Sequence, residues 1–502
     1  MRKIQNNQMQ LGEIDITDID LDLRSRDEIP QLLRGIQAVY ADKTARPKIF
    51  AILRQVIPQE VSATNGRPGM HLWRLFVLAT LRLNGNLDYD KVQELANNHR
   101  TLRQMLGHGL TDDGAYYSLQ AIKDNFRLLT PTLLNQLNAI IVAVGHQVVG
   151  HRPEAALTGK GDSFVLETDV HYPTDINLLL DALNKTIILT ARVCEQHGWS
   201  EWRQYGYNLR QIKKLYRQVQ QLKRTTAKAE TKRAQRETRL KAAYNAYLEL
   251  AATFLNKAET VLNRLEAVTE ARLRQQVATI HGFINDGRRQ MDQIQRRVFH
   301  GESIPHAEKI FSLFERHTEW ISKGKAGVPQ ELGQRVALIA DQYGFILTHQ
   351  VLKKQTDDQV AVALVEQTQL LFPTFDGCSF DKGFYTPKNR QTLLQRLKQL
   401  VLPKKGKLST ADQALENAPA WRAMRQQHSA IESTINAIEN HGLDRCLDHG
   451  EAGFERYVAL AKVARNLQIM GSYLMQKERQ AQQRRRRYRA TYQRNRALCE
   501  LA

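Results

Sequence analysis

Cysteine is scarce in this chain, and its few cysteines form no recognisable pattern. The four are Cys194, Cys378, Cys446 and Cys499, with no Cys-x-x-Cys pair and no histidine at zinc-ligand spacing. This argues against a zinc module and against a fold that depends on disulfides. It favours a protein of a reducing, cytoplasmic compartment.

Long apolar segments are also lacking. The N-terminus, MRKIQNNQMQ, has no apolar signal core, and no run of about 18 apolar residues follows it. We therefore expect a cytoplasmic protein without a membrane partner.

Acidic residues are outnumbered. Asp and Glu total 52 against 72 Lys and Arg, which gives a formal net charge of +20 over 502 residues. A surplus that is gathered in clusters points to a polyanionic partner, nucleic acid before membrane. The length allows several domains, and no internal repeat is present.

The first third of the chain is expected to be helical. Residues 1–44 are polar and acidic and indicate an irregular arm that ends in a short helix. Residues 45–150 indicate a compact helical unit, with one apolar helix ending at Gly85 and a second starting near Asp88. Short helices with Gly-marked turns fit a DNA-binding domain of the helix-turn-helix kind, and they fit any small bundle equally well.

The remainder indicates a mixed α/β domain that is interrupted by helices. The β-rich segment 163–170 predicts a strand. Leucines at coiled-coil spacing over 181–300 predict an inserted antiparallel helical hairpin. Further strands are expected at 309–316, 333–340, 345–352 and 373–380, and helices at 356–371, 388–400, 411–440 and from about 452 onward. The protein is thus expected to be α+β and predominantly helical, with a core over 151–180 and 301–470 and a basic C-terminal helix over 471–502.

Carboxylates stand in three settings that suit phosphodiester chemistry. Such cleavage commonly uses two divalent ions, and Mg²⁺ prefers carboxylate oxygens. The candidates around the first strand are Asp162, Glu167, Asp169 and Asp175. Asp381 ends a later strand and precedes Lys382-Gly383, where glycine allows a tight turn.

The third setting is helical. Glu432 is expected in mid-helix, with Arg425, His428 and Glu439 at offsets that place them on the same face. Plainer explanations remain open for each acid: Asp381 as a turn cap, Glu432 as half of a surface ion pair, Asp162 as a loop residue. The residues alone indicate a basic α/β protein that could be a nuclease.

Several stretches resemble one family. They are DSFVLETDVHYPTDINLL, FSLFERHTEWISKGK, SFDKGFYTP, HSAIESTINAIENHGLDRC and, in the N-terminal third, WRLFVLATLRLNGNLDYDKVQELANNHRTLRQMLG. Together they resemble the insertion-sequence DDE transposases, most of all the ISNCY-type group with an InsH-like N-terminal domain. The resemblance covers most of the chain outside the 181–300 region.

The resemblance implies a ribonuclease H-like mixed sheet and three catalytic carboxylates. Asp162 matches the family's first Asp, with Asp169 as the rival because it lies inside the expected strand. Asp381 matches the second Asp in an Asp-Lys-Gly-Phe turn, with Asp376 as the weaker rival. Glu432 matches the family's Glu.

The resemblance also implies cofactors and partners. Asp162, Asp381 and Glu432 are expected to hold two Mg²⁺ ions, with Mn²⁺ as a substitute, and Lys382 and His428 to contact DNA. His428 stands where relatives often have Arg, and this difference weakens the expectation that His428 contacts DNA. The expected partners are double-stranded transposon ends and target DNA, met by a homodimer in the bacterial cytoplasm at the nucleoid.

The C-terminal segment 477–496 is strongly basic. Its arginines Arg484, Arg485, Arg486, Arg487 and Arg489 are expected to contact the DNA backbone, the alternative being a solvated end. Two other functions compete with transposition: a nuclease without strand transfer, and a non-catalytic DNA-binding descendant of a transposase.

Overall fold

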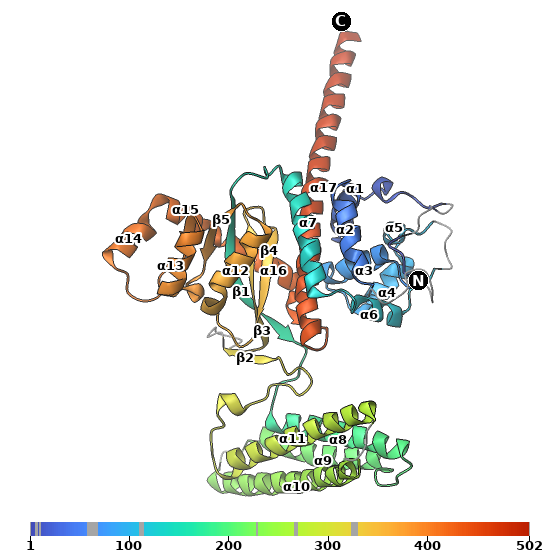
Figure 1. The fold of residues 1–502 in the computed structure, drawn as a ribbon, viewed down its shortest axis with the longest axis vertical. Coiled ribbons are helices and arrows are strands. Elements are labelled where there is room, and N and C mark those ends of the chain that lie inside the picture. Colours follow the sequence, from blue (N-terminus) through green and yellow to red (C-terminus); the bar gives the residue numbers. More distant parts are fainter. Residues whose placement is uncertain are drawn as a thin grey trace. The chain divides into compact units, whose positions relative to one another are not determined.

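The computed structural model describes residues 2–5, 9, 12–57, 69–109, 115–226, 229–265, 270–322 and 330–500. It contains two compact units (Figure 1). The first unit joins Met1–Asp169 to Glu319–Ala502 and contains the sheet; the second, Val170–Thr318, is helical. Each unit is described by itself.

The sheet is built around one long strand, β1 (Leu157–Thr168). On one side β1 pairs antiparallel with β3 (Gln330–Asp341), and on the other it pairs parallel with β5 (Phe375–Phe380). The remaining strands extend these pairs: β4 (Ile346–Leu352) and β2 (Glu319–Ser322) lie antiparallel to β3, β6 (Gln399–Val401) lies parallel to β5, and the short β7 (Arg445–Cys446) lies parallel to the end of β1. The spatial order of the main strands is therefore β4-β3-β1-β5-β6.

Two glycines in β1 show to which face of the sheet the neighbouring side chains of this strand point. A Cβ at Gly161 would lie 2.3 Å from the ring of Phe380, and one at Gly159 would lie 2.8 Å from the ring of Phe375. The phenyl rings of β5 therefore cover β1 on one face of the sheet. Because side chains alternate along a strand, Lys160 and Asp162 point to the opposite face.

Four helices of the C-terminal half pack on this sheet: α12 (Asp357–Leu371), α13 (Pro387–Arg396), α15 (Pro419–His428) and α16 (Ala430–Ile438). A fifth, α14 (Thr410–Asn417), packs on α15. Helix α12 packs against β3, β4 and β5, α15 packs against β5 and β6, and α16 packs against β1.

The described residues of the N-terminal third form helices, as expected. These are α1 (Ile29–Ala41), α2 (Ala45–Arg54), α3 (Leu72–Asn84), α4 (Tyr89–Asn98), α5 (Arg100–Met105), α6 (Leu119–Phe126) and α7 (Pro131–Val149). Helix α3 ends before Gly85 and Asp88 caps α4, which confirms both of those boundaries. A buried ion pair between Arg82 and Asp448, 2.8 Å long, ties α3 to the segment before the last helix.

One helix qualifies the expectation that no apolar segment is long. Among the described residues, α7 alone has the length and mean hydropathy of a membrane-crossing helix. It packs against α2, β4 and α17 (Glu451–Glu500), and its leucines Leu134 and Leu137 are fully buried. A core helix of a globular domain has the same composition.

The second unit differs from the hairpin expected over 181–300. Its described residues form four α-helices: α8 (Asp175–Gln196), α9 (Tyr205–Arg224), α10 (Glu230–Asn263) and α11 (Ala271–Phe299). The leucine spacing predicts helices correctly but not their number. A buried stripe on α8, which includes Leu179 and Leu183, packs with the other helices in one core.

Several other expectations meet a mixed outcome. The hairpin of β3 and β4 around 341–344 is confirmed, and so is the helix from about 356, which Thr356 caps with a capping box. The strand expected at 163–170 in fact begins at Leu157. No strand forms over 309–316, and the first returning strand is β2 at Glu319. The single helix expected over 411–440 is three helices, because Pro419 starts a new one and the chain breaks again at Ser429.

Helix α17 crosses α1 at very close range. A Cβ at Gly471 would lie 1.8 Å from the carbonyl oxygen of Gln31, and one at Gly35 would lie 2.0 Å from that of Leu467. The two backbones can touch only because both glycines lack a side chain. This contact anchors α17 to the N-terminal helices before it leaves the body of the unit (Figure 1).

We predict that Gly471→Ala lowers the free energy of unfolding by about 2–4 kcal/mol, because backbone atoms cannot yield as side chains do. The matched control is Gly282→Ala in α11, where a Cβ meets nothing within 4 Å. The control should be neutral or should stabilise by up to about 1 kcal/mol. Denaturant titrations of both variants provide the measurement, and equal stabilities would contradict the proposed close crossing.

Candidate active site

Two of the expected carboxylates are brought together by strand register. The parallel ladder of β1 and β5 pairs Lys160 with Ser379 and Gly161 with Phe380. One residue further along each strand come Asp162 and Asp381. Both therefore lie at neighbouring positions on the same face of the sheet.

The charge of Asp162 is poorly accommodated. Burial raises the pKa of this carboxyl from its ordinary 3.8 to about 6, and the nearby carboxylates Asp381, Asp357 and Glu432 contribute to the rise. The backbone N–H of Ser163 donates to Asp162 Oδ1 at 2.7 Å and opposes this rise only in part. Four acids from four elements therefore lie within electrostatic reach of one another.

Glu432 reaches this cluster from the first turn of α16 rather than from mid-helix. Ile431, Ile435 and Ile438 are buried and hold α16 in place, while Glu432 itself is exposed. An apolar stripe next to the acid therefore anchors the helix. The helix break at Ser429 separates Glu432 from Arg425 and His428, which lie on α15.

Two basic side chains of α15 lie close to the carboxylates. His428 is 7% exposed, and its Nδ1 lies 3.0 Å from Ser379 Oγ. This burial argues against the DNA contact expected of His428, since its ring supports β5 instead. The guanidinium of Arg425 donates to the carbonyl oxygen of Phe380 at 3.3 Å and lies 3.8 Å from Asp381 Oδ1. It can hold the Asp381 turn in position.

Asp357 is a member of the cluster that the sequence interpretation does not include among the candidates. Thr356 is the cap of α12, and Asp357 is its first residue. A Cβ at Gly383 would lie 2.9 Å from Asp357 Oδ2, so the Asp357 carboxylate lies close against the Asp381–Gly383 turn. Asp357 Oδ1 is buried without a hydrogen-bond partner among the described residues. The signal in the sequence is the pair of acids at the start of a capped helix.

A lysine is likewise absent from the sequence-based candidates. Lys160 lies two residues before Asp162 on the same face of β1, and burial lowers its pKa. It lines a cavity of about 170 Å³ between β1, β5 and α15, next to Ser379 and Met424. The carboxylate that acts on the charge of Lys160 is Asp341.

The rival carboxylates lie elsewhere. Asp169 follows the end of β1 and lies 3.7 Å from Arg445, which also contacts Glu167 at 3.3 Å. Asp376 forms an ion pair with Lys398 at 2.9 Å. Asp175 belongs to the helical unit. The register thus places Asp162, and not Asp169, beside Asp381.

The chemistry of this donor set suits a hard divalent cation. Among the described residues, no group of three or more His, Cys, Asp or Glu side chains is arranged to hold a metal ion as it stands. The unpaired Asp357 Oδ1 and the poorly solvated Asp162 would nevertheless both gain from a positive partner. Asp381 and Glu432 are exposed, so their side chains can turn toward an ion without disturbing the core.

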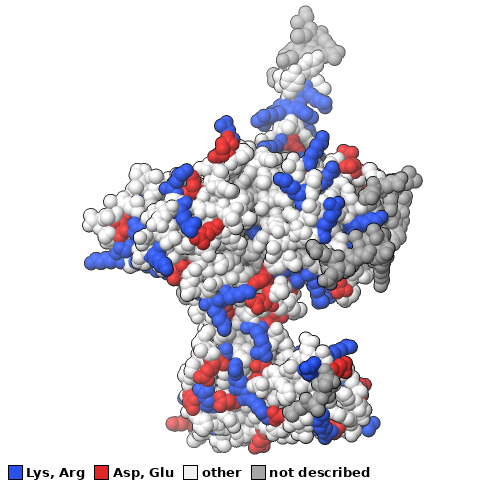
Figure 2. Space-filling model, viewed as in Figure 1, with Lys and Arg blue, Asp and Glu red and all other residues white. Residues whose placement is uncertain are grey.

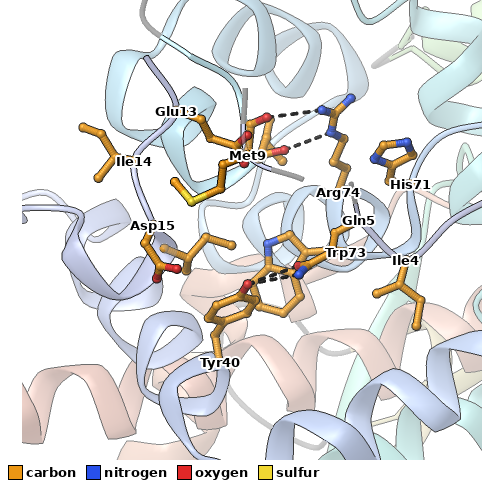
Figure 3. A pocket seen from close by; sticks show the side chains of 13 residues that line it. Ile4, Gln5, Met9, Glu13, Ile14, Asp15, Tyr40, His71, Trp73 and Arg74 are labelled. Atoms are coloured by element: carbon orange, nitrogen blue, oxygen red, sulfur yellow. Dashed lines mark hydrogen bonds between the residues drawn. The ribbon is translucent and has the colours of Figure 1, made fainter. Parts of the chain in front are cut away.

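A different cavity, shown in Figure 3, lies among the N-terminal helices and measures about 140 Å³. Its polar groups are engaged: Trp73 Nε1 donates to the carbonyl of Met105 at 3.0 Å, and Arg74 Nε donates to that of Leu106 at 2.9 Å. Its lining joins the N-terminal arm to α3, and this structural task accounts for the residues that surround it.

Comparison with protein-family models, with curated proteins and with solved structures found no match to this chain. Its function must therefore be inferred from the site itself.

The raised pKa of Asp162 makes stability depend on pH. The folded protein keeps this proton to higher pH than the unfolded chain, so folding loses stability as the pH rises from about 4 to about 6. Without metal, Asp162→Asn should therefore be more stable than the wild type at pH 8, by up to about 3 kcal/mol, and the gain should shrink toward pH 4. Chemical denaturation at several pH values measures it.

Asp169→Asn is the control for this experiment, because Asp169 is exposed and lies beside Arg445. It should show no gain at pH 8. Adding Mg²⁺ should stabilise the wild type more than Asp162→Asn and so narrow the difference. A wild type that is as stable as Asp162→Asn at pH 8 without metal would contradict the strained environment of Asp162.

Proposed function

We propose that this protein is a DNA transposase that binds the ends of an insertion sequence and catalyses metal-dependent cleavage and strand transfer. The observation that carries the proposal is that Asp381 and Glu432, both far from Asp162 in the chain, act on the Asp162 carboxyl and help to raise its pKa. These three residues are the ones that the resemblance to DDE transposases selects.

The topology supports the same proposal. A five-stranded order β4-β3-β1-β5-β6, with β3 alone of the central three running against its neighbours, is what a ribonuclease H-like core requires. The helical unit enters between β1 and β2, so the insertion leaves the strand pairing intact. The net charge of +20 supports a polyanionic substrate.

Each residue of the site then has a task. Asp162 and Asp381, from adjacent strands, and Glu432, from α16, would hold two Mg²⁺ ions, or Mn²⁺ in their place. When bound, such ions activate water or a 3′-hydroxyl and stabilise the charge of the reacting phosphate. Arg425, which lies 3.8 Å from Asp381 Oδ1, would hold the Asp381 turn.

The other parts of the chain would bind DNA. The helices over 45–150 are the proposed readers of the transposon end, and the exposed Lys382 beside Asp381 is placed to meet a phosphate. The protein would act as a homodimer in the bacterial cytoplasm and hold two transposon ends at once. A nuclease without strand transfer, or a non-catalytic DNA-binding protein, would fit the fold equally well and is separated by the next experiments.

Asp381→Ala and Glu432→Ala should each abolish cleavage of the transposon end while leaving its binding nearly intact, because metal ligands serve chemistry more than affinity. Asp162→Ala should behave in the same way. Gel shifts and cleavage assays with Mg²⁺, on DNA from the ends of the element, test all three variants.

Asp169→Ala and Asp376→Ala are the matched controls, since each removes a neighbouring carboxylate that lies outside the cluster. Both should cleave. Retained cleavage in Asp381→Ala or Glu432→Ala would refute the role of that residue. Cleavage without joining of the 3′-end to target DNA would favour the nuclease.

The last helix provides a second test. Beyond Glu478, which pairs with Arg34 at 2.6 Å, α17 continues away from the body of its unit and carries arginines (Figures 1 and 2). The exposed residues of this part include Arg484, Arg485, Arg486, Arg487 and Arg489. No ion pair joins these five to a described residue, so their charge is available to phosphates.

Replacing Arg484–Arg487 by Gln should weaken binding to transposon-end and random DNA by similar factors. An arginine run offers no geometry for reading base edges, so it should contact phosphates. The slope of log K against log salt should flatten by up to about 3.6 units if all four touch phosphates. Affinities at three salt concentrations on both DNAs measure this. An unchanged slope would mark the helix end as merely solvated, and a loss confined to the transposon end would show that it reads sequence.

A further inference from the structure

Helix α9 of the helical unit presents a row of cations to solvent. Its sequence, YGYNLRQIKKLYRQVQQLKR, contains no acidic residue. Tyr207, Arg210, Lys214, Arg217 and Arg224 are exposed and follow one another at spacings of three or four, or seven, residues. They therefore share one face along a helix about 30 Å long.

On the neighbouring helices, several cations form ion pairs with acids. On α10 and α11, Lys241 pairs with Glu237, Arg288 with Glu259, and Arg296 with three acids. On α9, by contrast, no ion pair joins Arg210, Lys213, Lys214, Arg217 or Arg224 to any residue that the structure describes. No acid among the described residues is paired with these five cations of α9, which favours an anionic partner there.

A cavity of about 740 Å³ lies where α9 begins. Its walls come from the end of α8, the following loop and the first residue of α9. They include Trp199, Trp202 and Tyr205 together with the exposed Arg192 and Arg203. Aromatic rings with arginines beside them suit a planar, anionic ligand.

A second observation concerns Trp202, which lies in the wall of this cavity. Its side chain is 1% exposed, packs against Phe254, and lies under Lys257 at 4.6 Å. The indole Nε1–H nevertheless finds no hydrogen-bond partner in the part of the chain that the structure describes. A buried donor left unpaired costs free energy, and because this nitrogen is closed off from solvent, an acceptor in the cavity would reach it only once a neighbouring side chain moved. Trp199 is held in place from the side by His197, with their ring centroids stacked 5.0 Å apart.

We propose that the helical unit is a DNA-binding module in its own right, in which the face of α9 holds the phosphate backbone and the cavity at its start receives one unpaired base. The inference rests on the proposed function only in taking DNA as the polyanion. Stacking on aromatic side chains needs a base that has left the helix, because paired bases hide their faces. The buried indole N–H then donates to an acceptor on that base.

The first test concerns the charge. Lys213→Gln, Lys214→Gln and Arg217→Gln combined, in the full chain, should weaken DNA binding and flatten its salt slope by up to about 2.7 units. The control removes the same charge from cations that already have partners: Lys241→Gln, Arg288→Gln and Arg296→Gln. Both proteins carry Asp381→Ala so that the DNA stays uncut.

The second test concerns the base. The probe is a duplex with one unpaired 2-aminopurine, compared with the same duplex fully paired. The wild-type chain should bind the unpaired probe about tenfold more tightly and quench its fluorescence, as stacking on an aromatic ring predicts. Tyr205→Ala should reduce this preference. Trp202→Phe should reduce it while keeping an aromatic ring that packs in the core.

The outcomes separate this inference from the proposed function. Equal losses in the α9 triple variant and in its control, or equal affinity for paired and unpaired probes, would overturn the inference while transposition could still stand. Failure of every variant to bind DNA would overturn both. Tighter binding of the same unpaired sequence as RNA would overturn the assignment of DNA as the ligand.

Discussion

The parallel pairing of β1 with β5 is the constraint on which the rest of the proposed site depends. It sets Asp162 beside Asp381 on one face of the sheet, and it holds only because Gly161 leaves room for the ring of Phe380 on the other. A side chain at Gly161 would push the strands apart. The two carboxylates would then lose their shared position, and α16 would have no fixed surface from which to offer Glu432.

The acidic cluster lowers the stability of the metal-free protein, and the same carboxylates are the proposed metal ligands. Folding brings Asp162 near three other carboxylates and removes much of its water, which raises its pKa to about 6. Close-packed like charges disfavour the folded state unless something positive joins them. Arg425 compensates only in part, since it lies at the edge of the Asp381 turn. The remaining deficit is what a pair of divalent ions would remove, so the same strain that weakens the metal-free protein favours metal binding.

The basic residues likewise differ in whether an acidic partner neutralises them. Two basic residues of the helical unit are paired with acids on adjacent helices, Arg288 with Glu259 and Arg297 with Asp175. By contrast, α9 contains no acidic residue, and none lies among Arg484–Arg489 of α17. Uncompensated charge repels itself at low salt, and it is retained at a cost that a polyanion would offset. Part of the net charge of +20 therefore lies on these two segments.

Local sequence determined much of this molecule. The strand before Asp381, the β3–β4 hairpin, the capped α12 and the long last helix all follow from short-range patterns, because alternation, turns and caps involve neighbouring residues. The α+β, mostly helical class follows from them. Tertiary structure alone decided the rest. The choice of Asp162 over Asp169 depends on the register with β5, more than 200 residues away. Asp357 joins the cluster because α12 starts beside the Asp381 turn, and His428 is buried because α15 packs on β5. Contacts between distant segments leave no periodic trace in the chain, so no local pattern could have shown them.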